Sequence, residues 1–448
     1  MQTPEQARDL AQDLVARAIA AGASAADAVF ACDASTDVQI RLGALEDVQR
    51  SESAAIGLRV FHGKRSASVS GADVTPSGLA TLAERAVAMA RLAPEDAYAG
   101  LAPEEMLARG PLPDLQLDDQ GDPDPALLRT LAEACEEAAR AVPGVTNSEG
   151  GSAGAVRSLM ALATSHGFAG SYGGSRYGIG ASVLAGSEGK MERDSASHSV
   201  RFLADLESPE SIGRRAGERA VARLGGGRLE SGPMPVIYDR RAGGSLIGPL
   251  LGAISGGAIA RKTSFLLEKR GTAIFDSMVS IIDDPHRIRG LRSRSFDGEG
   301  LATARFRVID QGVLTGWMMD SASARQLGEA PTGHAARGLS GAPSTGSSNI
   351  HMEAGRDSPA ALMAGITTGL YVTELIGMGV NGVTGDYSRG ASGFIIRDGE
   401  LAEPVSEITI AGNLIDMFAA LIPADDLEFR YAVNVPTLRV DGMVVASS

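Results

Sequence analysis

The feature that most limits how this chain can fold is a change of pattern at Gly225-Gly226-Gly227. Before this run, segments with helical spacing of apolar residues alternate with strand-like segments. After it, short alternating segments are separated by turn signals such as Asp310-Gln311-Gly312. A glycine run offers no side chains to a core and is typical of a linker. The sequence therefore predicts an N-terminal domain over residues 1–224, a linker over 225–233 and a C-terminal domain over 234–448.

The first of these domains is expected to be α/β, with helices and a mixed or antiparallel sheet. Thr3 and Gln6 form the capping-box pattern of a helix start, with Pro4 at a favourable first position. Residues 93–123 are rich in Pro, Asp and Gly and are expected to form a long surface connection. Further helices are expected at Pro76–Met89, Pro125–Ala141 and Pro209–Leu224. Strands are expected at Val38–Leu42 and Ile56–Val60, and within Val145–Leu203.

The second domain is expected to be mainly β. Its clearest strand patterns are Pro235–Tyr238, Ala304–Ile309 and Gly393–Ile396, and its few helices include Ser321–Leu327. Together, the two patterns predict the α+β class, with an N-terminal α/β domain and a β-rich C-terminal domain.

Ala242–Ala260 stands apart because it carries no charge over 19 residues and is flanked by basic residues. Six glycines and Pro249 leave it weakly apolar, which favours a buried helix over a membrane span. Glycine costs about 1 kcal/mol relative to alanine inside a helix, so a stripe of glycines predicts close approach of another backbone. Tight helix–sheet packing and a binding site explain such a stripe equally well. The glycines that recur every four residues are Gly244, Gly248, Gly252 and Gly256.

Composition excludes several classes of protein. The net charge of −14 argues against nucleic-acid binding as the main role, because such binding needs clustered Lys and Arg. Cys32 and Cys135 form no metal-binding pair, and Cys135 falls on the apolar stripe of a predicted helix. The first residues have neither a basic nor an apolar signal region. We therefore expect a cytoplasmic protein without a signal peptide, a membrane span or bound nucleic acid.

Three familiar motifs fail on inspection. Gly377–Gly382 matches G-x-G-x-x-G, but the residues after it predict a turn and a strand where dinucleotide binding needs a helix. Ser245 follows two glycines without completing the G-x-S-x-G elbow. His351 and Glu353 would share one face of a strand, but two ligands are too few for a zinc site.

One polar, glycine-dense segment is harder to dismiss. It can present backbone N–H groups and a guanidinium group to a ligand carboxylate or a peptide. As a plain β-turn it needs no function, and the two interpretations stay open. Its residues begin with Thr384, Gly385, Asp386, Tyr387, Ser388 and Arg389.

Extended in both directions, that segment resembles the TldD/PmbA family, specifically its PmbA (TldE) branch. The resemblance rests on Gly382–Ala391 and Pro404–Leu414, and Pro331-Thr332-Gly333 and Arg261–Ser264 fit the same family. It implies an α/β domain followed by a β-rich domain. It also implies a cytosolic partnership with a TldD-like subunit in a peptidase that degrades unfolded or leader peptides.

The same resemblance implies that this chain lacks the family's zinc site. In the TldD branch, H-E-x-x-x-H lies just before the Arg-x-Thr-Ser segment, and counting back from Thr263 places Ile247, Gly248 and Gly252 at the ligand and base positions. Glycine has no side chain to bind metal or move a proton. We therefore expect no catalytic residue and no cofactor in this chain, with zinc in the TldD-like partner. Extended peptide is the expected substrate, and the isolated chain can form a homodimer.

Two other functions remain open at this stage. One is an autonomous hydrolase with an unrecognised nucleophile, for which Ser245 and Ser388 are the candidates. The other is a regulator of another protein, as the older "modulator of gyrase" name of the family suggests. With a net charge of −14, such regulation should act through protein contacts or proteolysis.

Overall fold

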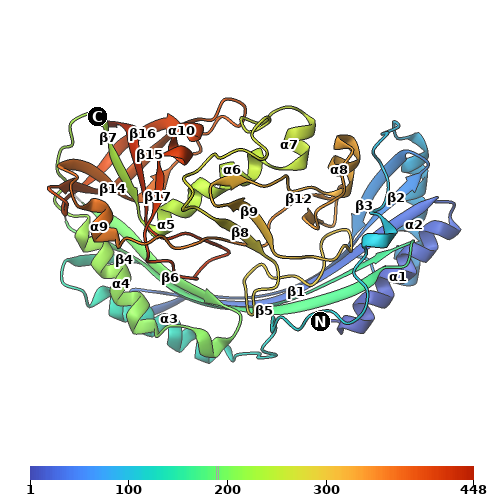
Figure 1. Ribbon diagram of the computed structural model, residues 1–448. Helices are drawn as coiled ribbons and strands as arrows, with labels where there is room; N and C mark the ends of the chain where they lie inside the picture. Colours follow the sequence, from blue (N-terminus) through green and yellow to red (C-terminus); the bar gives the residue numbers. More distant parts are fainter. Residues whose placement is uncertain (188, 190, 448) are drawn as a thin grey trace.

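The computed structural model describes residues 1–187, 189 and 191–447. Its N-terminal part is built on one antiparallel six-stranded sheet with the order β3-β2-β1-β4-β5-β6. Four of the strands have 17 to 20 residues, and Figure 1 shows them as one long curved sheet. The strands are β1 (Ala25–Arg41), β2 (Ala44–His62), β3 (Arg65–Gly71), β4 (Val145–Thr164), β5 (Ala169–Ala185) and β6 (Glu192–Val200).

Helices cover the convex face of this sheet in two pairs, one toward each end (Figure 1). The first pair is α1 (Pro4–Ala20) and α2 (Pro76–Leu92), and the second is α3 (Pro125–Arg140) and α4 (Pro209–Ala222). The predicted capping box of the first helix is confirmed, since Thr3 and Gln6 bond reciprocally. Each helix pair packs its apolar stripe on its own cluster of buried sheet residues. Cys135 lies in the second of these clusters, where burial raises the pKa of its thiol to about 12.

The C-terminal part lies over the concave face of the sheet (Figure 1). Five of its strands form a closed ring, because β16 pairs with both β15 and β19. The ring strands are β7 (Gly232–Tyr238), β14 (Thr368–Ile376), β15 (Asp386–Arg397), β16 (Glu400–Asn413) and β19 (Leu438–Ser447), with β17 (Leu421–Pro423) beside β19. A second sheet contains β10 (Val313–Leu314), β9 (Phe306–Asp310), β8 (Ile281–Asp284), β13 (Asn349–Met352) and β18 (Val433–Asn434).

Short elements complete this part of the chain: the strand pair β11 (Ala335–Ala336) and β12 (Ser344–Thr345), and the helices α8 (Ser321–Leu327), α9 (Pro359–Met363) and α10 (Leu414–Ala419). The α+β class, with an α/β first part and a β-rich second part, is confirmed. The exact domain limits at residues 224 and 234 stay a prediction.

The uncharged stretch at residues 242–260 does not form the single helix that its sequence predicts. It is divided into α5 (Arg240–Gly243), a 3₁₀ turn at Gly244–Leu246, α6 (Ile247–Ala253) and α7 (Gly256–Ala260). Ser255 separates the last two helices because its extended backbone and its hydroxyl cap the start of α7. Within the described residues, no helix is long and apolar enough to cross a membrane.

The segment 93–123 is more than the surface connection that its composition predicts. Leu107 is buried and forms a bridge to Leu301, and Leu115 and Leu117 are also buried. The guanidinium group of Arg325 donates to the backbone carbonyls of Tyr98, Gly100 and Leu101, near the start of the segment, at 2.7 to 3.0 Å. The connection therefore fastens the C-terminal part to the sheet, which its Pro, Asp and Gly content did not indicate.

A buried cluster of charges joins the two parts of the chain. Asp27, 2% exposed, accepts hydrogen bonds from Arg59 at 2.7 Å and from Arg337 at 2.9 Å. Glu299 lies 3.9 Å from Arg59 and accepts from the backbone N–H of Ser321. A buried charge that loses its partner is strongly destabilising. The cluster therefore fixes one position of the C-terminal part on the sheet.

Replacing Asp27 by asparagine should destabilise the protein by about 3–5 kcal/mol, because two buried guanidinium groups lose their shared counter-charge. Urea unfolding followed by circular dichroism measures this change. The matched control is Asp13→Asn, which breaks a half-exposed pair with Arg17 and should cost less than about 1 kcal/mol. Equal losses in the two variants would contradict a role of the cluster in holding the parts together.

Glu299 should give the free energy of unfolding a distinct pH dependence. Burial raises the pKa of its carboxyl group from 4.5 to about 6. The folded protein then holds this proton more tightly than the unfolded chain, so the stability that protonation provides is lost as the pH rises from about 4.5 to 6. The wild type should therefore lose stability relative to Glu299→Gln across this window, and a pH-independent difference would refute the shift.

Candidate functional site

A groove with a volume of about 750 Å³ opens beside α6, a size typical of small-ligand sites. Glycine and apolar residues form most of its wall, and they come from two places: α6 with its flanking turns, and the loop between β14 and β15. Met378, on that loop, is 96% exposed. The lining residues are Ser245, Gly248, Pro249, Gly252, Ala253, Thr263, Met378, Val380, Gly382 and Arg389.

The glycine stripe on this segment leaves open space at two of its four positions. A Cβ atom added to Gly248 or Gly252 would meet no atom within 4 Å. At Gly256 the same atom would lie 2.4 Å from the Ser323 hydroxyl oxygen. The prediction that the whole stripe reflects close backbone packing is therefore wrong for Gly248 and Gly252, whose missing side chains leave the groove open.

Two of the three positions that the family resemblance assigns to a zinc motif, Gly248 and Gly252, line this groove. Ile247 is 2% exposed and packs into the core, whereas Gly248, Pro249, Gly252 and Ala253 line the groove. A motif placed one residue later, at Gly248, Pro249 and Ala253, would thus direct all its side chains to one cavity. None of the lining residues in the described part is His, Cys, Asp or Glu. The described residues also contain no group of three such side chains placed to hold a metal ion.

The six candidate residues at 384–389 have separate surroundings. Thr384 donates its hydroxyl to Asp386 at 2.6 Å, and the Asn413 amide donates to the Thr384 carbonyl oxygen at 3.0 Å. Gly385 has a positive φ of 81°, and its carbonyl accepts from the N–H of Leu414. These bonds hold the start of β15 against the end of β16. They also explain why the two segments that carry the family resemblance, Gly382–Ala391 and Pro404–Leu414, occur together in one chain.

Of the remaining three residues, only Arg389 lines the groove. Tyr387 is 2% exposed and belongs to the core, and burial raises the pKa of its phenol. Ser388 lies on the exposed face of β15 and pairs with Ala411. The structure thus brings Arg389 together with Gly248, Gly252 and Ser245, and leaves the other five out of the cavity.

Met378, Val380 and Pro249 are groove residues that sequence reasoning missed. Met378 and Val380 lie inside the G-x-G-x-x-G match that was tested for dinucleotide binding. A strand follows that match, as predicted, and no helix begins at its glycines. The signal in the sequence was an apolar methionine between two glycines, and its near-complete exposure is known from the structure alone.

Neither serine candidate has the surroundings of an activated nucleophile. Such a hydroxyl needs a base within hydrogen-bonding distance. The Ser245 hydroxyl is buried and makes no hydrogen bond within the described residues. The carboxylates of the neighbouring hollow, Asp194 and Glu374, pair with Arg241 and Arg223.

The pair His351 and Glu353 is split by the fold. His351 is 9% exposed on β13, which ends before Glu353, and its ring lies edge-on to Phe429. Burial, with help from Arg287, lowers the pKa of His351. A neutral, buried imidazole against an aromatic ring fits a packing role.

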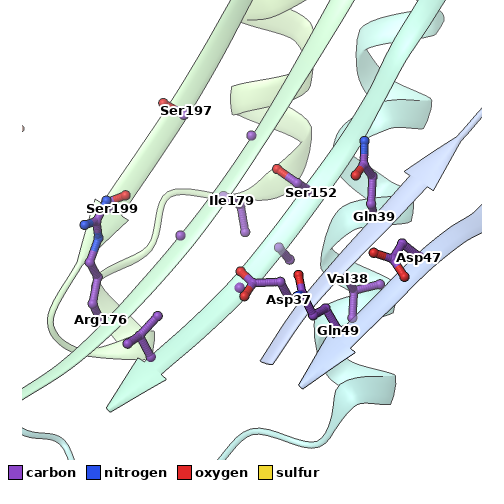
Figure 2. A pocket seen from close by; sticks show the side chains of 15 residues that line it. Asp37, Val38, Gln39, Asp47, Gln49, Ser152, Arg176, Ile179, Ser197 and Ser199 are labelled. Carbon is purple, nitrogen blue, oxygen red and sulfur yellow. The ribbon is translucent and has the colours of Figure 1, made fainter. Parts of the chain in front are cut away.

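A second hollow of about 450 Å³ lies on the concave face of the long sheet (Figure 2). Asp37 and Gln39 of β1, Ser152 of β4 and Ser197 of β6 contribute to it, whereas Val38 is buried on the helix-covered face. This alternation makes the concave face polar, with carboxylate, amide and hydroxyl groups along several strands. Such a wall can form hydrogen bonds to an extended chain without reading its side chains.

Models of one protein family match most of the chain. They are the PmbA/TldA metallopeptidase domain 1 over residues 27–90, the central domain over 118–224 and the C-terminal domain over 231–447. The metalloprotease PmbA of Escherichia coli O157:H7 is 36% identical over 447 residues, which cover 99% of this chain and 97% of that protein.

Two solved structures share the fold over nearly the whole length. A Bacteroides thetaiotaomicron protein, described provisionally as a modulator of DNA gyrase, has a TM-score of 0.92, 28% identity and full coverage of both chains. TldE from Thermococcus kodakarensis has a TM-score of 0.88 and 20% identity, with 98% of this chain and all of that chain covered.

Alanine substitutions along α6 and α7 should separate open from closed glycine positions. Gly252→Ala should keep or raise stability by up to about 1 kcal/mol, because the new methyl group meets nothing and helix propensity improves. Gly256→Ala should cost about 1–3 kcal/mol through its clash with Ser323. Thermal unfolding of the two variants measures the difference, and a loss of stability in Gly252→Ala would show that the groove is filled by packing.

Proposed function

This chain belongs to the PmbA/TldA metallopeptidase family, and we propose that it is the TldE-like subunit of a cytoplasmic peptidase whose zinc is held by a TldD-like partner. In this role the chain binds and positions unfolded or leader peptides, and the partner cleaves them. The chain itself then contains neither a metal ligand nor a catalytic residue.

The observation that carries this proposal is the groove beside α6. The family's relatives are named metalloproteases, yet the positions that the resemblance assigns to the metal motif are Ile247, Gly248 and Gly252 in this chain. The same motif placed one residue later would fall on glycine, proline and alanine. These residues supply neither a ligand nor a base. The groove keeps an open volume of about 750 Å³ at the same place. A cavity that persists without its reactive groups fits a binding role beside a catalytic partner.

The concave face of the sheet supports the second half of the proposal. Its polar side chains line a hollow on the side of the sheet over which the C-terminal part lies (Figures 1 and 2). Hydrogen bonds from these side chains to the backbone of an extended peptide give affinity that tolerates many sequences. We therefore assign this face to the wall along which an extended substrate passes.

The proposal predicts that activity requires the pair of subunits. The purified chain should contain far less than one zinc per molecule by elemental analysis after mild dialysis, and it should leave unfolded casein intact. Adding the TldD-like partner should give casein cleavage that a chelator abolishes and zinc restores. Casein cleavage by this chain alone after chelation would refute the proposal.

Two variants sharpen this experiment. Ser388→Ala should leave cleavage by the pair within about twofold of wild type, because its hydroxyl takes no part in the chemistry. Ser245→Ala should leave kcat at saturating casein within about twofold for the same reason, whatever its effect on KM. Loss of kcat in either variant, with the fold intact by circular dichroism, would instead favour the autonomous hydrolase.

A further inference from the structure

We propose that the groove beside α6 binds the free C-terminus of an extended peptide, with Arg389 as the partner of the terminal carboxylate and the apolar wall receiving the last side chain. The inference rests on the proposed function, because it names the part of a peptide substrate that this subunit holds.

Arg389 is the first element of this site because its charge has no counter-charge in the described part of the chain. It lies on β15 and lines both the groove and the neighbouring hollow. The other guanidinium groups that line these two cavities are paired: Arg241 with Asp194 at 2.7 Å, and Arg193 with Glu149 at 3.5 Å. Glu374, which also lines the hollow, is already held by Arg223 at 2.5 Å. The Nε atom of Arg389 is buried and has no hydrogen-bond partner among the described residues.

Ser245 supplies a second polar atom at the same place. Its hydroxyl oxygen is buried and without a partner in the described part, and the residue lines the same two cavities as Arg389. Buried polar atoms in proteins are nearly always hydrogen-bonded, so two unsatisfied ones beside an open cavity point to a missing ligand. Guanidinium and hydroxyl groups both donate, which selects an acceptor with two oxygens such as a carboxylate.

The tyrosine beside Arg389 does not neutralise it. Tyr387 and Arg389 are two residues apart on β15 and share one face of the strand. Burial raises the pKa of the Tyr387 phenol, so that the phenol stays neutral and offers Arg389 no negative charge. The guanidinium group therefore remains available to an anion that enters the groove.

The apolar wall of the groove determines which kind of residue can carry the bound carboxylate. Pro249, Ala253, Val380 and Met378 give it an apolar wall, and the absent side chains of Gly248 and Gly252 keep it open. A C-terminal residue carries a carboxylate and its side chain on the same Cα atom, so both can be bound at once. The carboxylate of an internal Asp or Glu lies at the end of its own side chain and leaves no apolar group beside it. The geometry thus favours a terminal residue with an apolar side chain.

The test is calorimetric titration of the full chain with an acetylated pentapeptide that ends in leucine, as the free acid and as the amide. The acid should bind at least about tenfold more tightly than the amide, since the amide loses the charge-assisted bonds to Arg389. The same peptide ending in aspartate should also bind more weakly than the leucine acid. Equal affinity of acid and amide would overturn the proposal.

Variants locate the site on the chain. Arg389→Gln should abolish the preference for the acid, whereas Arg397→Gln, on the same strand with an exposed guanidinium paired to Glu403 at 3.1 Å, should keep it. Gly252→Val should weaken binding of the acid, because its side chain occupies the groove without touching neighbouring atoms through its Cβ. An acid preference that survives in Arg389→Gln would place the site elsewhere and refute the assignment.

The result of the binding test can be distinguished from the result of the test of the proposed function. Binding is measured on this chain without a partner, whereas the proposed function is measured as cleavage by the pair. If the wild-type chain binds the acid and the amide equally while the pair still cleaves casein, only the terminal-carboxylate site is refuted. A retained acid preference without any partner-dependent cleavage would refute only the subunit role.

Discussion

The arrangement of this protein depends on guanidinium groups that cross from one part of the chain to the other. Arg59 and Arg337 meet at Asp27, and Arg201 and Arg325 donate to backbone carbonyls across the same boundary. Only four of the 41 basic residues are lysines. Arginine suits this task because its planar group has five donors in fixed directions and stays charged when buried. These contacts therefore hold the C-terminal part in one position over the concave face of the sheet.

The glycines of α6 and α7 show how an absence of side chains can be a structural feature. A helix without Cβ atoms loses propensity, and packing at Gly256 compensates for that cost where another helix approaches. At Gly248 and Gly252 no such contact exists, so the missing atoms appear as open volume. The same short segment thus combines a close helix contact at one end with a cavity at the other. Only three-dimensional neighbours distinguish the two, since the spacing in the sequence is identical.

Local signals in the sequence predicted local structure well. The helix Ser321–Leu327 has the predicted limits because Asp320 caps its first turn and Gly328 takes the left-handed conformation at its end. The four N-terminal helices begin at predicted prolines for the same reason. The limits of the uncharged segment were missed, since its break at Ser255 competes with a continuous apolar pattern. The buried part of 93–123 was missed because its partners, such as Leu301, are distant in sequence.

The candidate site was predictable only in part, because the polar residues at 384–389 have two different roles in the structure. Thr384 and Asp386 are conspicuous as polar residues, yet their groups are used in bonds that join β15 to β16. Arg389 has the same appearance in the sequence, but its charge is left without a counter-charge beside an apolar groove. A partly buried cation without a partner carries a desolvation cost that packing alone does not require. A subunit with a purely structural role gains nothing from that cost, whereas one that receives an anionic ligand recovers it on binding.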